Sequence, residues 1–312
     1  MARQRADLTK IKTIPLDMRK CKVSVKEFAR TSKKGDSFRD FYDGLPAILM
    51  GRDFKCVVDA VVEAARAKKM VIVMMGAHVI KCGLSPLIID LMRKGVLKTV
   101  ALNGAGIIHD TEIAMIGRTS EDVGQGIVDG SFGMALETAT FINDAINTGF
   151  KGGFGIGEAV GSKILEKKLP HKDMSILATG HELDIPVTVH VAIGTDITHQ
   201  HPSADGEAIG EGSLLDFKNF ILSVGKLEGG VVLNFGSAVV LPEVFLKSVT
   251  VARNLGHTLN KFTTANFDMI RQYRPWENVI SRPTSSGGKG YNIIGHHEIL
   301  IPLLYRSIIE KL

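Results

Sequence analysis

The sequence predicts an α/β fold, namely a single Rossmann-like domain with a mostly parallel sheet flanked by helices. Short apolar runs that end in glycine or polar residues alternate with segments of helical periodicity, which is how parallel sheets are built. No Pro/Ser-rich linker or internal repeat divides the chain. With 312 residues, 45% hydrophobic and 23% charged, the composition is that of a globular protein with a large core.

The first elements after the N-terminal segment show this alternation clearly. Residues 53–69 place valines at helical spacing, and the apolar run 70–75 ends at Gly76, as expected for a strand buried on both faces. A helix is expected from Pro86 to Lys94, with Ser85 placed to cap it and Pro86 at its first position.

The remaining strands are predicted from similar runs. Residues 99–102 form the second expected strand, followed by a glycine turn. Further strands are expected at 185–191, 230–234 and 291–295. The glycine-rich run from Gly149 to Gly161 is predicted to be a flexible loop within the domain.

The charge distribution separates an N-terminal arm from the domain. The net charge is +5 and the isoelectric point about 9.0, but the basic excess lies mainly between Arg3 and Lys34. We therefore expect a basic arm at 1–45, docked through Phe28, Phe38 and Phe41, and one domain at 46–312. With a single Trp and four Tyr to stack on bases, nucleic acid is not expected as a partner.

Cysteine usage and hydropathy indicate the compartment. Cys21, Cys56 and Cys82 show no CxxC spacing and cannot pair completely, which fits a reducing environment. The first residues lack the apolar stretch of a secretory signal, and no run reaches about 18 apolar residues. We therefore expect a cytoplasmic protein without a membrane partner.

The turn Asn103-Gly104-Ala105-Gly106 is the clearest candidate for gripping a diphosphate. Ligands of open α/β sheets bind beyond the carboxyl ends of the strands, where helix N-termini present free N–H groups to anions. Glycine removes side-chain bulk where the backbone must approach phosphate. The turn lacks GxGxxG spacing, so a tight strand-to-helix connection is the alternative. A second strand ends in a similar small-residue turn at 235–238.

Several further segments occur in a definite order between about Asp53 and the C-terminus: Gly76-Ala77-His78, the turn 103–110, residues 205–211, the turn 236–238, Thr263-Thr264-Ala265, Arg282-Pro283, Gly288-Lys289-Gly290, and a closing helix after His296-His297. In this order the chain resembles the deoxyhypusine synthase family, which includes homospermidine synthases and uncharacterised bacterial relatives.

The resemblance implies an activity, a cofactor and an assembly. Members of that family have a parallel sheet flanked by helices and form tetramers with NAD near the subunit interfaces. They oxidise spermidine or a related polyamine with NAD and form an imine, and then pass an aminobutyl group to an amine acceptor through an enzyme lysine. The chain is therefore predicted to be an NAD-dependent transferase of alkyl groups, a homotetramer whose acceptor could be a protein lysine.

The same resemblance implies which residues contact the cofactor. His109 stands where the family has a ribose-binding glutamate, and His296 replaces an aspartate beside the adenosine. The other implied NAD contacts are Asn103, Gly104, Ala105, Gly106, Asp205, Gly236, Ser237, Thr264 and Ala265.

Two residues are assigned to the substrate. Glu211 falls where a carboxylate holds the polyamine, since acidic groups pair with ammonium groups. Lys289 is the counterpart of the attacking lysine, which must be neutral to act as a nucleophile. The family's tryptophan beside this lysine is missing, and its later His-His pair is replaced by 241–243, so a solvent-exposed loop lysine is the alternative.

Two other hypotheses remain open from the residues. Gly104-Ala105-Gly106-Ile107 also resembles the opening turn of sirtuin-like NAD-consuming deacylases, although the expected cysteine pairs are missing. The lost histidine pair and tryptophan suggest instead a non-catalytic NAD-binding protein.

Histidines raise the question of a metal. His190, His199 and His201 lie near Asp196, and His296-His297 follows a later strand, so they would form a metal site if these turns converge. We predict no metal, because a metal site also needs orienting partners that the sequence does not reveal.

Overall fold

The computed structural model describes residues 5–312, and the chain divides into two compact units after Arg52. The secretory-signal prediction and the basic arm include the first four residues, which lie outside the described part. The first unit contains short 3₁₀ turns, the helix α1 (Phe38–Gly44) and the first residues of α2 (Leu49–Arg66). In α1, Phe38 packs against Phe41 and Tyr42. Its 3₁₀ turns are η1 (Leu8–Lys10), η2 (Leu16–Met18) and η3 (Val25–Glu27).

The second unit is built on a six-stranded, fully parallel sheet, which confirms the predicted fold class. Its strands are β1 (Val71–Met75), β2 (Thr99–Asn103), β3 (Val187–His190), β4 (Val231–Phe235), β5 (Thr263–Asp268) and β6 (Lys289–Ile294). The spatial order is β3-β2-β1-β4-β5-β6, the doubly wound order of Rossmann folds. The strand order reverses between β1 and β4, which makes this pair the topological switch point.

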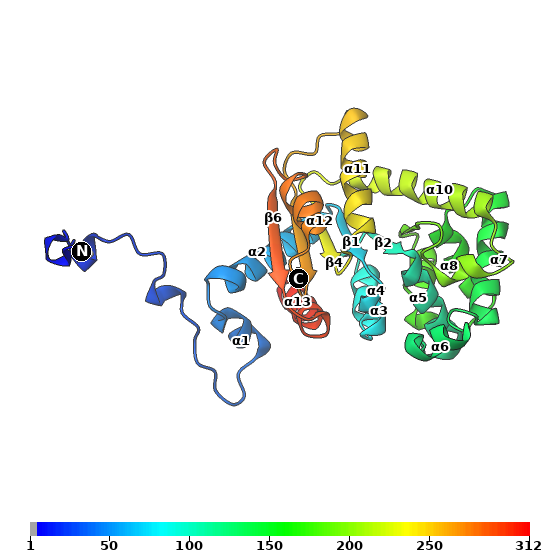
Figure 1. Ribbon diagram of the computed structural model, residues 1–312, viewed down its shortest axis with the longest axis horizontal. Coiled ribbons are helices and arrows are strands. Elements are labelled where there is room, and N and C mark those ends of the chain that lie inside the picture. Colours follow the sequence, from blue (N-terminus) through cyan, green and yellow to red (C-terminus); the bar gives the residue numbers. More distant parts are fainter. Residues whose placement is uncertain (1–4) are drawn as a thin grey trace, which may run out of the picture. The chain divides into compact units, whose positions relative to one another are not determined.

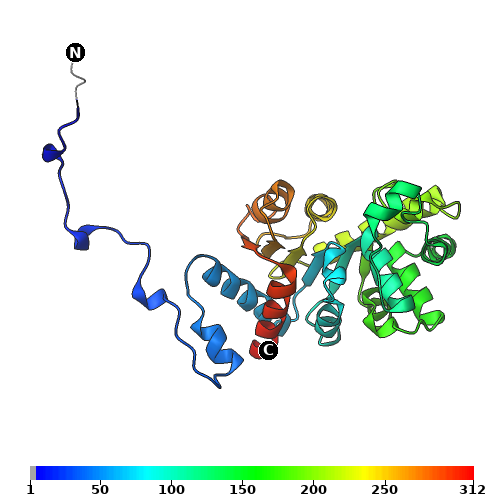
Figure 2. The same cartoon turned by 60° about the horizontal axis from the view of Figure 1, so that its bottom comes forward.

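Helices cover the sheet, and the chain segment that connects β2 to β3 folds into a separate group of helices. On one face, α10 (Gly206–Val224), α11 (Val240–Asn254) and η6 (Trp276–Ser281) enclose a core with Ile72, Met74 and Val232. Figures 1 and 2 show α5 to α8, in green, gathered beside the β3 edge of the sheet. The remaining elements are α2 (Leu49–Arg66), α3 (His78–Lys81), α4 (Ser85–Arg93), α5 (Gly104–Ile116), α6 (Val123–Asp129), α7 (Leu136–Gly152), α8 (Ile156–Glu166), η4 (Lys172–Met174), α9 (Ile176–Glu182), η5 (Ile197–Gln200), α10 (Gly206–Val224), α11 (Val240–Asn254), α12 (Tyr273–Pro275), η6 (Trp276–Ser281) and α13 (His297–Lys311).

The prediction of a flexible loop from Gly149 to Gly161 is wrong. Helix α7 continues to Gly152, and α8 begins at Ile156. A Cβ on Gly157 would overlap the backbone carbonyl of Val187 in β3, so this glycine permits close packing of helix against strand. The glycines therefore indicate close packing rather than flexibility.

Two further features bear on the sequence predictions. No helix within residues 5–312 is long and apolar enough to cross a membrane. Cys21, Cys56 and Cys82 are all free thiols.

Candidate functional site

The site region is the carboxyl edge of the sheet around the switch point, where the turns after β1 and β4 meet. The N–H of Gly76 donates a hydrogen bond to the carbonyl of Phe235 at 2.9 Å. A Cβ on Gly76 would lie 3.0 Å from the carbonyl oxygen of Gly236, so the two turns touch through their backbones. Gly236 itself has a φ of +65°, a conformation that favours glycine.

His297 covers the turn after β4. Its side chain comes from the first residue of α13, and the residue is only 6% exposed. The Nε2 atom lies 3.1 Å from the carbonyl oxygen of Phe267, so this nitrogen donates the hydrogen bond. The ring also contacts Gly236, where a Cβ would overlap it, and its centroid is 6.0 Å from that of His78. His297 and His78 thus line the switch point, although the sequence assigned the cofactor contact to His296.

His296 has a different position from its neighbour. It is the N-cap residue of α13, its side chain is 61% exposed, and its Nδ1 lies 3.8 Å from the carboxylate of Glu298. His296 therefore lies at the rim of the carboxyl edge, where an incoming ligand has access to it.

Helix α5 begins directly at the end of β2, as the predicted phosphate turn requires. Asn103 is its N-cap, and the side-chain oxygen of Asn103 accepts a hydrogen bond from the N–H of Gly106 at 3.0 Å. The turn residues Gly104 and Ala105 form the first turn of the helix rather than a separate loop. The four residues are thus brought together beside the switch point.

The space next to Gly104 is occupied by the carboxylate of Asp196. A Cβ on Gly104 would overlap the carboxylate carbon and both carboxylate oxygens of Asp196. Asp196 is 9% exposed, and its Oδ2 has no hydrogen-bond partner within the described residues. Burial raises the pKa of this carboxyl, while His199 and the hydroxyl of Thr195 lower it. The sequence placed Asp196 only in a metal hypothesis and gave no signal of this contact.

We expect Gly104→Ala to lower the free energy of unfolding by about 1–3 kcal/mol, because the new methyl group overlaps Asp196. The same substitution in an Asp196→Ala background should cost much less, since the obstructing carboxylate is gone. Urea denaturation of the four proteins of this double-mutant cycle measures the coupling. Additive effects would show that the two residues do not touch.

His109 lies on α5 within a chain of polar side chains. The hydroxyl of Thr119 donates to Glu112, so it must accept from Nδ1–H of His109, which is 2.6 Å away. Thr138 donates to the other oxygen of Glu112 at 3.0 Å. Burial lowers the pKa of His109, with an opposing effect from Glu112 and a smaller lowering by Lys81. The imidazole is thus held neutral with Nε2 as its unprotonated nitrogen.

Asp205 and Glu211 lie on the helix that follows η5. Asp205 is the N-cap of α10 and accepts hydrogen bonds from the N–H groups of Glu207 and Ala208 at 2.9 and 3.4 Å. The side chain of Glu211 is 42% exposed, and its Oε1 lies 4.0 Å from Nζ of Lys218. The structure gives Asp205 a capping role and leaves Glu211 on a solvated part of the helix.

Ser237 continues the turn after β4. It is 6% exposed, and its Oγ accepts a hydrogen bond from the N–H of Leu241 at 3.3 Å. Its carbonyl accepts from Asn234, the first of three asparagines whose amides are linked across β4, β5 and β6 at 2.7 and 2.9 Å. This ladder, Asn234, Asn266 and Asn292, fixes the backbone just before the carboxyl edge.

Thr264 and Ala265 do not reach this edge. They are the second and third residues of β5, and both are completely buried in the sheet. Their assignment as cofactor contacts is therefore corrected: the segment is a strand that the sequence analysis did not expect.

Lys289 lies at the opposite edge of the sheet. Lys289 is the first residue of β6 and pairs with Thr263, the first residue of β5. The turn at Gly236 instead follows the carboxyl end of β4. The predicted Gly-Lys-Gly turn is part of the strand, because β6 starts earlier than residue 291. Within one chain, the structure separates Lys289 from Asn103, Gly236 and His297.

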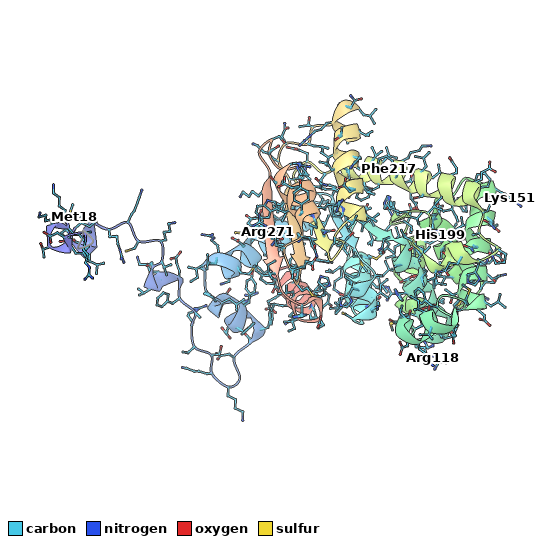
Figure 3. The ribbon with its side chains drawn as sticks, viewed as in Figure 1. Met18, Arg118, Lys151, His199, Phe217 and Arg271 are labelled. Atoms are coloured by element: carbon cyan, nitrogen blue, oxygen red, sulfur yellow. The ribbon has the colours of Figure 1, made fainter. Side chains whose placement is uncertain are left out.

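The histidines of the metal hypothesis have separate structural partners. His190 is buried at the end of β3 with its Nε2 3.0 Å from the hydroxyl of Thr188, and burial lowers its pKa to about 3. His199 accepts from the N–H of Gly194, and His201 bonds the carbonyl of Gly133. Figure 3 shows His199 among the helices beyond the β3 edge, far from Arg271 on the β6 side. Across residues 5–312, no three His, Cys, Asp or Glu side chains are grouped to hold a metal ion.

Comparisons with known proteins give likenesses of fold. No family model and no curated protein matches the chain. A Methanococcus maripaludis S2 protein provisionally described as a conserved LOR/SDH protein is 15% identical, with a TM-score of 0.50, and the match covers 83% of this chain and 68% of that one. An Entamoeba histolytica protein provisionally described as a deoxyhypusine synthase is 9% identical, with a TM-score of 0.52 and coverage of 90% and 96%.

A third similar structure is AgrE in a ternary complex with ornithine and NAD⁺, at 17% identity and a TM-score of 0.53. That match covers 83% of this chain but 33% of AgrE, so the chain spans about a third of that protein's length. At these identities the comparisons establish a shared doubly wound fold, with a distant likeness to a deoxyhypusine synthase-like protein at that level.

Proposed function

We propose that this chain is an NAD-dependent enzyme that acts on an amine. The proposal depends on one observation: in a doubly wound sheet, the glycine turns after β1 and β4 meet at the switch point, and the N-terminus of α5 begins beside them. Dinucleotides bind at such switch points, with phosphates at a helix N-terminus. Asn103, Gly104, Ala105, Gly106, Gly236 and Ser237 would form the cradle, with His109, Asp205 and His296 around it.

The reaction we propose is transfer of an aminoalkyl group from a polyamine such as spermidine to an amine acceptor. A carbon next to nitrogen gives a hydride to NAD⁺ and the amine loses a proton, which yields an imine and NADH. The acceptor amine then adds to the imine carbon and displaces the remaining amine, which gives a new imine; NADH would return the hydride to its carbon while a proton returns to its nitrogen. AgrE, of which about a third matches this chain, is solved in a ternary complex with ornithine and NAD⁺, which supports testing NAD together with amines as ligands.

Calorimetric titration with NAD tests the first half of this proposal, and NADH absorbance in the presence of spermidine, putrescine or agmatine tests the second. We expect NAD to bind and one of these amines to give NADH. Failure to bind at millimolar NAD would refute the proposal. Nicotinamide release would point to the hydrolase alternative, and binding without any cofactor reduction to a non-catalytic role.

We expect Lys289→Ala to leave NAD affinity and NADH formation within about twofold of wild type, because Lys289 lies at the amino edge of the sheet. The matched control is Lys261→Ala, another lysine near the same edge, where it precedes β5. Loss of amine transfer in the Lys289 variant alone, with normal NAD binding, would show that this lysine reaches a site completed by another subunit of the proposed homotetramer.

A further inference from the structure

Asp196 has an unusual environment for a carboxylate. It is nine-tenths buried, its Oδ2 has no hydrogen-bond partner within the described residues, and it packs directly against Gly104 at the start of α5. A buried carboxylate oxygen without a donor is unfavourable. The neighbouring hydroxyl of Thr195 interacts with this carboxyl group but leaves Oδ2 without a donor among the described residues.

The place that Asp196 occupies is suited to an anion. Helix α5 has 13 residues, and the N–H groups of its first turn have no partners within the helix. The partial positive charge at the helix start favours negative groups. Gly104 leaves the space that a phosphate oxygen would need, and the carboxylate of Asp196 fills that space.

The chain just before Asp196 is exposed to solvent. Residues 192–195 are exposed, and Gly194 has a φ of +95°. Beyond Asp196, Asn143 donates to the carbonyl of Thr198 at 3.0 Å, and before it the N–H of Gly194 donates to Nδ1 of His199 at 3.1 Å. Rotation of Asp196 toward the exposed segment would open the space beside Gly104 without unfolding η5.

We propose that Asp196 is a built-in competitor for phosphate: its carboxylate closes a diphosphate site at the N-terminus of α5, and a dinucleotide binds only when Asp196 moves out. This inference rests on the proposed NAD function and adds to it a residue that limits cofactor affinity. A ligand phosphate and the Asp196 carboxylate exclude each other both by volume and by like charge.

The test is calorimetric titration with NAD, and with ADP as the smaller diphosphate, of wild type, Asp196→Ala and Asp196→Asn. Both variants should bind NAD and ADP more tightly, by about tenfold, within the range of typical coupling between competing groups. Asp196→Asn keeps the shape of the side chain, so it provides an answer if the alanine variant folds poorly. Circular dichroism and thermal melting establish that each variant is folded.

Asp184→Asn is the matched control. It removes the same charge from an exposed residue just before β3, at the amino edge, and asparagine tolerates its positive φ of 54°. Its affinity for NAD should equal that of wild type. Equal NAD affinities in wild type and both Asp196 variants would overturn the inference and leave the proposed function intact. Absence of NAD binding in every protein would instead refute the proposed function itself.

Discussion

Asp216→Ala should lower the free energy of unfolding by about 4 kcal/mol, since it leaves two buried N–H groups without acceptors at about 1–3 kcal/mol each. The carboxylate accepts hydrogen bonds from the N–H of Gly157 at 3.0 Å and of Val189 at 2.8 Å. It thereby joins the start of α8 to β3, and it is 2% exposed. Guanidinium denaturation followed by circular dichroism measures the loss.

The control for this substitution is Glu166→Gln, at the other end of α8. Glu166 is 69% exposed and forms a surface ion pair with Lys167, so its replacement should change stability by less than about 0.5 kcal/mol. A similar small effect for Asp216→Ala would contradict the capping role of Asp216.

The same residue predicts a dependence of stability on pH. Burial raises the pKa of Asp216 from 3.8 to about 7 in the folded chain. Between these values the folded chain retains a proton that the unfolded chain releases, so this group makes stability fall as pH rises from about 4 to about 7. Relative to wild type, Asp216→Asn should therefore become more stable as pH rises through that window. A difference that is constant from pH 4 to 8 would contradict this titration.

Gly236→Ala should cost about 2–5 kcal/mol of stability and should abolish NAD binding. A φ of +65° costs an alanine about 1–2 kcal/mol, and the new methyl group would overlap the ring of His297, which adds about 1–3 kcal/mol. The turn after β4 would shift, and with it the backbone contact to Gly76. Urea denaturation and NAD calorimetry on one preparation measure both effects.

Two further variants separate the backbone cause of this penalty from the steric cause. Gly210→Ala lies in α10 with open space around its Cβ, so it should be neutral or stabilise by up to about 1 kcal/mol. His297→Ala should recover the steric part of the Gly236→Ala penalty and leave the φ part. A full-sized penalty in the double variant would show that His297 does not press on Gly236.

The sequence was sufficient for the fold class because buried parallel strands leave a strong local signal. The runs at 70–75 and 230–234 are continuous apolar segments, and both became central strands. Strand β5 was missed because Thr263, Asn266 and Asp268 interrupt its apolar pattern; its asparagine is satisfied only by neighbours on β4 and β6.

The sequence predicted small-residue turns at the carboxyl ends of strands, and the structure places Asn103 at the end of β2 and Gly236 just after β4. That these two strands flank β1 depends on contacts distant in sequence, which no local pattern predicted. The approach of Asp196 to Gly104 joins residues 92 positions apart, so no local pattern reveals it. The predicted start of β6 was two residues too late. Lys289 was therefore expected in a turn, whereas it is the first residue of the strand, at the amino edge of the sheet.

Hydrogen–deuterium exchange with and without saturating NAD tests the central claim, that the cofactor binds at the switch point. We expect slower exchange of backbone amides in the turns at 76–78, 103–106 and 236–238, with the amino-edge segment 286–290 unchanged. Unchanged exchange in all three turns, or protection confined to the amino edge around Lys289, would contradict it.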